Sequence, residues 1–322
     1  MPHPAAAPQA PSLDRTDLGL YATLVLVWGT SWYAIHHQLG VVAPVVSLLW
    51  RFLLAAALCV CVALWRGERM AWPARLHLRF AAAGVLMFST NFLLFYLAGR
   101  HVPTGLLAVV FALASPINLG LSTLFFRRPL EPRVLAGAAI GIAGVGCLYA
   151  PEIAGTGFDA AALGGLALSV AGTCCFCLGN MVSATIQEDG VGDRAATAWG
   201  MVYGSAWLFI LCLAIGAPFS IDLRPPYLIS LVWLAAGSSV AAFIAYLALI
   251  KRMGPARAGF ATVLFPVVAL AISSLFEDYH WGPLAIFGVG LVAVGNVVVL
   301  GLFGRSRSRP QRPKADPGSI SA

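Results

Sequence analysis

Long uncharged runs of apolar residues recur along this chain of 322 residues. Each run is about 17–24 residues long, and short polar connections separate one run from the next. The ten runs cover approximately residues 18–35, 44–65, 80–98, 105–126, 134–150, 161–184, 195–215, 227–250, 258–276 and 283–303. A helix needs about 20 apolar residues to cross the hydrocarbon core of a bilayer. The pattern therefore predicts an all-α polytopic membrane protein with ten transmembrane helices.

Two parts of the chain resemble one another at a constant offset of 150 residues. Residues 96–126 and 246–276 both begin with Tyr-Leu-Ala, both carry a proline twenty positions later, Pro116 and Pro266, and both end in Phe. The same offset relates small and polar residues in other runs, namely Gly29 with Gly179, Thr30 with Asn180 and Ser47 with Thr197. A constant register over several helices predicts an internal repeat.

The repeat divides the chain into two units of five helices, residues 18–150 and 161–303. Because five is an odd number, the second unit begins on the opposite side of the membrane and is an inverted copy. Inverted-topology repeats are typical of secondary transporters, which bind their substrate near the midplane between the repeats. We therefore expect a small-molecule solute as the partner, within a lipid bilayer.

Basic residues set the expected orientation. With the N-terminus in the cytoplasm, 17 of the 20 Lys and Arg residues fall on the cytoplasmic side. Cytoplasmic loops of membrane proteins carry such an excess, so both termini are predicted to be cytoplasmic. We expect residues 1–17 to be a disordered N-terminal tail, and residues 304–322 to be a basic cytoplasmic tail that is attracted to anionic lipid.

Composition excludes several classes of function. The chain is 60% hydrophobic and 10% charged, whereas soluble domains are roughly 45–50% apolar and about 25% charged. The net charge of +7 follows the membrane topology and gives no sign of a nucleic-acid partner. The seven cysteines lie within apolar runs and are read as small buried hydrophobes. No phosphate-binding G-x-x-x-x-G-K-[ST] loop occurs, and we expect no cofactor and no metal.

Four stretches carry a family resemblance: WGTSWYAI at 28–35, LLWRFLLAA at 48–56 after Pro44, the apolar run of the fourth helix that leads to Pro116, and FATVLFPVVALAISSLFEDYHW at 260–281. They resemble EamA-type members of the drug/metabolite transporter superfamily, and the resemblance covers nearly all of residues 18–303. It implies ten helices in two inverted repeats, a bacterial inner-membrane location, and movement of metabolites or amino acids, often as efflux.

One departure from the family pattern affects the first half of the chain. The family usually has a Glu-Arg pair after its fourth helix, whereas this sequence has Arg127-Arg128. A role that the family assigns to that glutamate therefore does not carry over to this position.

Polar and aromatic residues within the runs are candidates for substrate contact, because such groups in a membrane usually face the bundle interior or a cavity. The candidates are Trp28, Ser31, Trp32, Asn91, Tyr96, Ser115, Asn118, Asn180, Tyr246 and Thr262. The alternative for Ser and Thr is a bond to a carbonyl of their own helix. Asn side chains could instead link two helices, and the two Trp residues could form an interfacial belt. The repeat favours the two tyrosines.

Two charged residues are further candidates. Arg51 lies about two turns inside a run and could anchor a substrate carboxylate, but we favour a structural role, by snorkelling or by bonding to carbonyls. No carboxylate lies at mid-depth in a run. Glu277, at the outer end of the ninth run, is the candidate for proton coupling. Proton antiport, facilitated diffusion and exchange all remain open.

Glycines crowd the fifth and tenth runs, and small residues let membrane helices approach closely. These helices are read as scaffold or as the contact of a homodimer. An alternative function is a membrane-embedded enzyme acting on lipid-type substrates, with phosphate bound by the basic loops at 66–79 and 127–133. Because the outer face offers almost no catalytic groups and an enzyme has no obvious need for an inverted repeat, we prefer a transporter without enzymatic activity.

Overall fold

The computed structural model of the chain describes residues 14–127, 131–154, 160–253, 261–277, 279 and 281–300. The predicted C-terminal tail, residues 1–13 of the predicted N-terminal tail, Arg128 and the side chain of Thr262 lie outside the described part. Helix α1 begins at Arg15, so residues 15–17, which were expected in the N-terminal tail, are helical.

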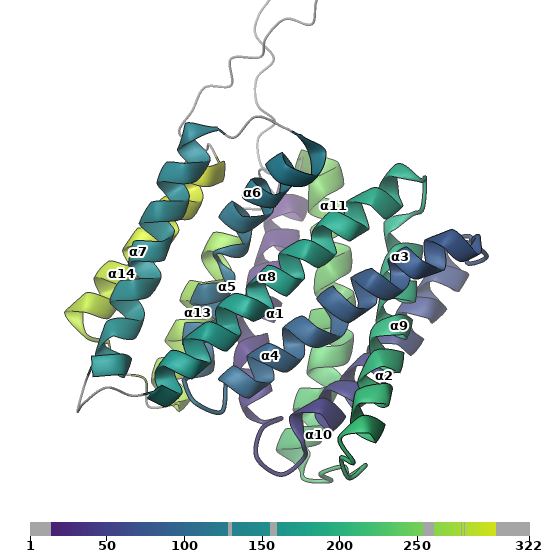
Figure 1. The fold of residues 1–322 in the computed structure, drawn as a ribbon, viewed down its shortest axis with the longest axis horizontal. Coiled ribbons are helices and arrows are strands. Elements are labelled where there is room, and N and C mark those ends of the chain that lie inside the picture. The colour runs from purple at the N-terminus through teal and green to yellow at the C-terminus, as the bar shows by residue number, and fades with distance from the viewer. Residues whose placement is uncertain are drawn as a thin grey trace, which may run out of the picture.

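Helices make up all of the regular structure within these described ranges, which contain no strand (Figure 1). In chain order they are α1 (Arg15–His36), α2 (Pro44–Trp65), α3 (Ala74–Val85), the π-helical segment η1 (Leu86–Thr90), α4 (Asn91–Ala98), α5 (Thr104–Phe111), α6 (Ala114–Phe126), α7 (Pro132–Ala154), α8 (Ala160–Glu188), α9 (Asp193–Ala214), α10 (Pro225–Val232), the π-helical segment η2 (Trp233–Ala241), α11 (Ala242–Met253), α13 (Ala261–Phe276) and α14 (Pro283–Leu300).

Eight helical segments of the described chain are long and apolar enough to cross a membrane. Three of them combine shorter elements: α3–η1–α4, α5–α6, and α10–η2 with the start of α11. The apolar helices α13 and α14 are shorter. The all-helical membrane architecture is thus confirmed, whereas a total of ten spans stays a prediction.

Local sequence signals explain where several helices begin and break. The Asp14 side chain accepts a hydrogen bond from the Asp17 N–H, and the Asp17 side chain accepts one from the Asp14 N–H, which is a capping box. Pro44 opens α2 at a position where its missing N–H costs nothing. Pro116 cannot donate to the carbonyl of Ala112, and the helix is interrupted there, between α5 and α6.

The π-helical segments share a detail of hydrogen bonding. Ser89 in η1 donates through its hydroxyl to the carbonyl of Gly84, five residues earlier, at 3.0 Å. Ser239 in η2 donates in the same way to the carbonyl of Leu234, also five residues earlier, at 2.9 Å. The two serines are 150 residues apart. Each fills the wide turn of a π-helix, a distortion that is frequent at functional sites.

Contacts between the two halves of the chain come in reciprocal pairs. Helix α1 packs on α13 and α11, and correspondingly α8 packs on α6 and α4. Helix α2 packs on η2, and correspondingly α9 packs on η1. Helix α2 also packs on α9, and α7 packs on α14 at one edge of the bundle (Figure 1). Each half is therefore buried mainly against the other.

The two glycine-rich helices, α7 and α14, are paired with each other within the chain. A Cβ atom on Gly137 would lie 2.6 Å from the carbonyl oxygen of Gly295, and one on Gly144 would lie 2.6 Å from that of Gly288. Absence of side chains lets the backbones touch, as in other small-residue interfaces of membrane helices. These glycines thus act as scaffold, and the homodimer stays a prediction.

Candidate functional site

Aromatic rings from both halves of the chain meet where α1, α5, α8, α11 and α13 converge. The Trp28 ring centroid lies 5.6 Å from that of Tyr246 and 5.9 Å from that of Phe265. The Phe111 ring lies 6.2 Å from Phe265 and 4.8 Å from Phe176. Trp28, Phe111, Phe176 and Tyr246 are half-buried. Of this cluster the sequence analysis named only Trp28 and Tyr246, because phenylalanine in an apolar run carries no distinguishing signal.

Both candidate tryptophans contact other helices of the bundle. The Trp28 indole donates to the carbonyl of Ser238 on η2, at 3.3 Å. Trp32 is buried and packs edge-on against Phe95 and at a tilt against Phe111, with centroid distances of 5.2 and 6.0 Å. Helix α1 therefore directs both indoles toward the other half or the bundle centre.

The smaller polar candidates have different surroundings. The Ser31 hydroxyl donates to the carbonyl of Trp28 in its own helix, at 2.7 Å, which is the structural alternative for this residue. Asn180 on α8 donates to Asn118 on α6, at 3.3 Å, and both side chains are half-buried. Ser115 is half-buried beside Pro116. Asn91 is buried, and its Oδ1 has no hydrogen-bond partner within the described part of the chain.

The two tyrosines that the repeat relates do not share one environment. Tyr96 on α4 is fully buried and lies within electrostatic range of Arg51. Tyr246 on α11 is half-buried and lies against Trp28. The sequence symmetry between them is therefore broken by their neighbours.

Arg51 is enclosed by α2, α4 and η2. Only 1% of its surface is exposed, which rules out snorkelling to either surface in this conformation. Its Nη2 lies 3.4 Å from the Ser239 hydroxyl, and its guanidinium carbon lies 4.5 Å from the centroid of the Phe92 ring. Among the described atoms, Nε and Nη1 have no hydrogen-bond acceptor.

The sequence did not predict a buried polar cluster that lies near the start of α2. Gln38 donates to the carbonyl of Tyr227, at 2.9 Å, and to the Ser230 hydroxyl, at 2.6 Å. The Tyr227 hydroxyl lies 3.0 Å from that of Ser47. These contacts join the α1–α2 connection to α10. Polar residues at helix ends are ordinary, and Ser47 stood out in the sequence only as the repeat partner of Thr197.

Glu277 caps a helix in the other half of the chain. Its carboxylate accepts hydrogen bonds from the Thr104 backbone N–H and from the Thr104 hydroxyl, both at 2.6 Å, at the start of α5. Ser273 donates to the same carboxylate, and the Glu277 side chain is only 4% exposed. A carboxylate is favourable at a helix N-terminus because it complements the helix dipole. Glu277 therefore has a structural function whether or not it also binds protons.

Two histidines lie beside this carboxylate. The His36 Nδ1 is 3.8 Å from Glu277 Oε1. Partial burial lowers the pKa of His37, the neighbouring His36 adds to that effect, and Glu277 opposes it. Burial therefore disfavours the charged form of the His37 ring beside this carboxylate.

Three ion-pair groups connect the two halves at helix ends that the topology prediction places on the cytoplasmic side. They are Arg79 with Asp189 at 2.7 Å, Arg194 with Glu68 at 2.8 Å, and Arg252 with both Asp14 and Asp17. Each group joins residues of the first half to a residue of the second, one in the Arg79 and Arg194 pairs and two, Asp14 and Asp17, in the Arg252 group. Separating the halves at this end would break all three.

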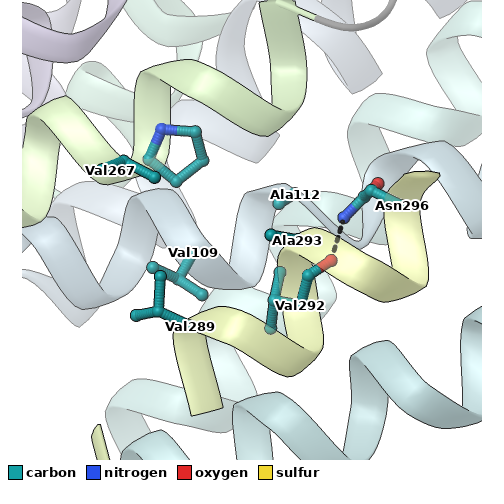
Figure 2. Close-up of a pocket in the computed structure, with 8 residues that line it drawn as sticks. Val109, Ala112, Val267, Val289, Val292, Ala293 and Asn296 are labelled. Atoms are coloured by element: carbon teal, nitrogen blue, oxygen red, sulfur yellow. Dashed lines mark hydrogen bonds between the residues drawn. The ribbon is translucent and has the colours of Figure 1, made fainter. Parts of the chain in front are cut away.

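Two cavities among the described residues are small. One of about 10 Å³ lies between α5, α13 and α14, and Figure 2 shows that Asn296, its one polar lining residue, is turned toward the carbonyl of Val292. A second, of about 20 Å³, borders Ser239 and Arg194. A space of roughly 10–15 Å³ holds about one water molecule, so neither admits an organic solute in this conformation. The described residues contain no group of three or more His, Cys, Asp or Glu that could hold a metal ion.

Known proteins resemble this chain along most of its length. The "Uncharacterized inner membrane transporter YedA" of Escherichia coli is 27% identical over 288 residues, 86% of this chain and 90% of that protein. The "Probable amino-acid metabolite efflux pump" of Escherichia coli is 23% identical over 91% of this chain and 96% of its own length. "Protein PagO" of Salmonella typhimurium is 23% identical over 82% of this chain and 84% of its own length.

A solved crystal structure shares the fold, with a TM-score of 0.64 at 19% identity, over 90% of this chain and 98% of that one. The model of the EamA-like transporter family matches residues 18–150 and 163–301. Together with eight helices suited to cross a membrane, this match shows that the chain is a multi-pass membrane protein that belongs to the EamA-like transporter family.

Proposed function

We propose that this protein is a secondary transporter that exports small organic metabolites, amino acids or similar amphiphilic solutes, across the bacterial inner membrane. Ten helices in two inverted repeats of five form the carrier, with both termini in the cytoplasm. The halves rock against each other around a central cavity and expose it to one side of the membrane at a time.

The aromatic cluster between the halves is the observation that carries this proposal. Trp28 on α1 lies against Tyr246 and Phe265 of the second half, and Phe265 lies near Phe111 of the first. The half-buried rings offer an apolar wall, and Asn180, one turn after Phe176 on α8, adds hydrogen-bonding groups together with Asn118. Binding pockets for small molecules combine these two features.

Reciprocal contacts support the inverted repeat. The first half contacts the second through the same helix pairs, with the roles exchanged, and the π-helical serines Ser89 and Ser239 occupy the same register. A pseudo-two-fold axis between two inverted repeats would produce this arrangement.

The ends of the bundle support alternating access. At the predicted cytoplasmic end the halves are held together by the three ion-pair groups of Arg79, Arg194 and Arg252. At the opposite end they are held by the bonds of Glu277 to Thr104 and of Gln38 to Tyr227. Polar contacts of this kind can form and break without exposing an apolar core. Export as the direction follows the name of one relative, a probable efflux pump.

Solute counterflow into liposomes containing the purified full-length protein would test the proposal. Labelled amino acids and small amphiphiles would be screened with and without an imposed proton gradient. We expect counterflow of at least one solute and a strong loss of it in Trp28→Ala. The matched control is Trp65→Ala, because Trp65 is 79% exposed at the end of α2. Absence of counterflow for every solute, in protein shown to be folded, would contradict a carrier function.

A further inference from the structure

Arg51 is a buried cation without an anionic partner in the described structure. Arg51 is 1% exposed, and within the described ranges no Asp or Glu forms an ion pair with it. Its contacts with described residues are one long hydrogen bond to Ser239, the hydroxyl of Tyr96, and the faces of Phe92 and Phe52. Removing a charge from water is costly unless a counter-charge and further hydrogen bonds compensate it. The neutral contacts compensate only part of that cost.

The fold itself does not require a charge at this place. The repeat offset relates Arg51 on α2 to Met201 on α9. Met201 is also 1% exposed, and α9 packs on η1 as α2 packs on η2. The repeat also relates Ser239 in η2, the neighbour of Arg51, to Ser89 in η1, and both serines make the same hydrogen bond to a carbonyl five residues earlier. An apolar side chain of similar length therefore fills the equivalent position, so packing alone does not explain Arg51.

Neighbouring groups could complete a binding site for an anion. The Tyr96 hydroxyl is fully buried and lies beside the Arg51 guanidinium, in a contact that lacks the geometry of a well-formed hydrogen bond. The Ser239 hydroxyl adds a second neutral group beside the guanidinium. Ser239 also borders the cavity of about 20 Å³ that extends toward Arg194. Ser239 therefore connects the surroundings of Arg51 to a small cavity that also borders Arg194.

We propose that Arg51 binds the carboxylate of the transported solute, an inference that rests on the proposed transport function. A single guanidinium matches one negative charge, whereas a phosphate dianion would bury an unmatched second charge. Arginine N–H groups form strong charge-assisted hydrogen bonds with carboxylates. The solute therefore carries one carboxylate, and the rest of the solute molecule lies toward the aromatic cluster.

Matched acids and amides test this assignment. The probes are phenylacetate with phenylacetamide and L-phenylalanine with L-phenylalaninamide, and binding to the full-length protein in detergent is measured by titration calorimetry. We expect at least one acid to bind and its amide to bind more weakly. Arg51→Met should weaken binding of that acid by roughly 30-fold or more, because one partner of a buried charge pair is lost. The control Met201→Leu should bind as the wild type does.

Thermal unfolding without any probe separates this role from a structural one. Arg51→Met should melt at the wild-type temperature or above it, because replacing a poorly paired buried charge with an apolar group is often neutral or stabilising. Arg51→Lys keeps the charge but loses the planar fork, and we expect an intermediate affinity. A lower melting temperature of Arg51→Met with unchanged acid binding would assign Arg51 to structure and overturn the proposal.

Counterflow distinguishes the failure of this inference from failure of the transport function. Counterflow of amides or amines that persists in Arg51→Met, without any binding of acids, would overturn the carboxylate assignment and leave the transporter intact. Counterflow of no solute at all would overturn both. Counterflow of an acid that is lost in Arg51→Met and retained in Met201→Leu would support both.

Discussion

Gly144 and Gly288 face each other so closely that a Cβ atom on either one would lie 2.6 Å from the carbonyl oxygen of the other. Gly137 and Gly295 repeat this relationship further along the same pair of helices. Backbone contact of this kind leaves no room for a side chain. The α7–α14 pair is therefore one of the most closely packed parts of the described bundle, and its glycines are needed for a steric reason.

Gly144→Ala should destabilise the protein, since the added methyl group meets backbone atoms that cannot rotate away. We expect a cost of about 1–3 kcal/mol, typical of overpacking. Gly146→Ala is the matched control on the same helix, because a Cβ atom there would meet nothing within 4 Å. Thermal unfolding in detergent measures both variants. Equal melting temperatures would show that the helix pair adapts to the methyl group.

Glu277→Gln should weaken the attachment of α5 to α13. The amide keeps the shape of the side chain but loses the negative charge. That charge strengthens the two hydrogen bonds from Thr104 and complements the helix dipole at the start of α5. A hydrogen bond to a charged group contributes roughly 1.5–3 kcal/mol, so we expect a loss of about 1–2 kcal/mol in the free energy of unfolding. Glu131→Gln is the control, because its side chain is 55% exposed.

Solute transport by the Glu277→Gln variant tests whether this residue also couples transport to protons. If Glu277 carries the coupling proton, the variant loses the dependence of counterflow on the proton gradient. Retained gradient dependence, together with a lower melting temperature, would restrict Glu277 to capping α5.

Thiol labelling tests the predicted orientation. Ser220→Cys lies exposed between α9 and α10, and Arg66→Cys lies exposed after α2, on the side predicted to be cytoplasmic. In intact cells a membrane-impermeant maleimide should label the first variant and spare the second, and opening the cells should expose both. Cys61 is exposed in α2, so the wild type supplies the background. The opposite labelling pattern would reverse the topology.

Arg79 and Asp189 should be coupled in transport more strongly than in folding. Their side chains are 45% and 31% exposed, and exposed ion pairs typically contribute only about 0.2–1 kcal/mol to stability. Arg79→Gln and Asp189→Asn should therefore melt close to the wild type but change the rate of counterflow by opening the cytoplasmic end. A double-mutant cycle in counterflow should be non-additive. Additive effects would mean that the pair does not hold the two halves together.

Much of the architecture follows from the sequence. Water and lipid sort side chains by polarity, so uncharged runs of helix length are enough to predict membrane helices. The helices are longer than the apolar runs in several places: α3 begins at Ala74 and α8 extends to Glu188, each by continuing with polar residues beyond the apolar run. The offset of 150 residues also relates Ser89 to Ser239, and the structure shows that both serines make the same hydrogen bond within a π-helical segment.

The partners of the charged groups were decided only by the tertiary structure. Thr104 and Glu277 are 173 residues apart, and Gln38 and Tyr227 are 189 residues apart. Periodicity reports which face of a helix is apolar, but it carries no information about which distant helix covers that face. The sequence by itself determined that Arg51 lies within the membrane. Packing of α2 against η2 decided that this charge is enclosed by neutral groups, and that is the physical basis for assigning it a ligand.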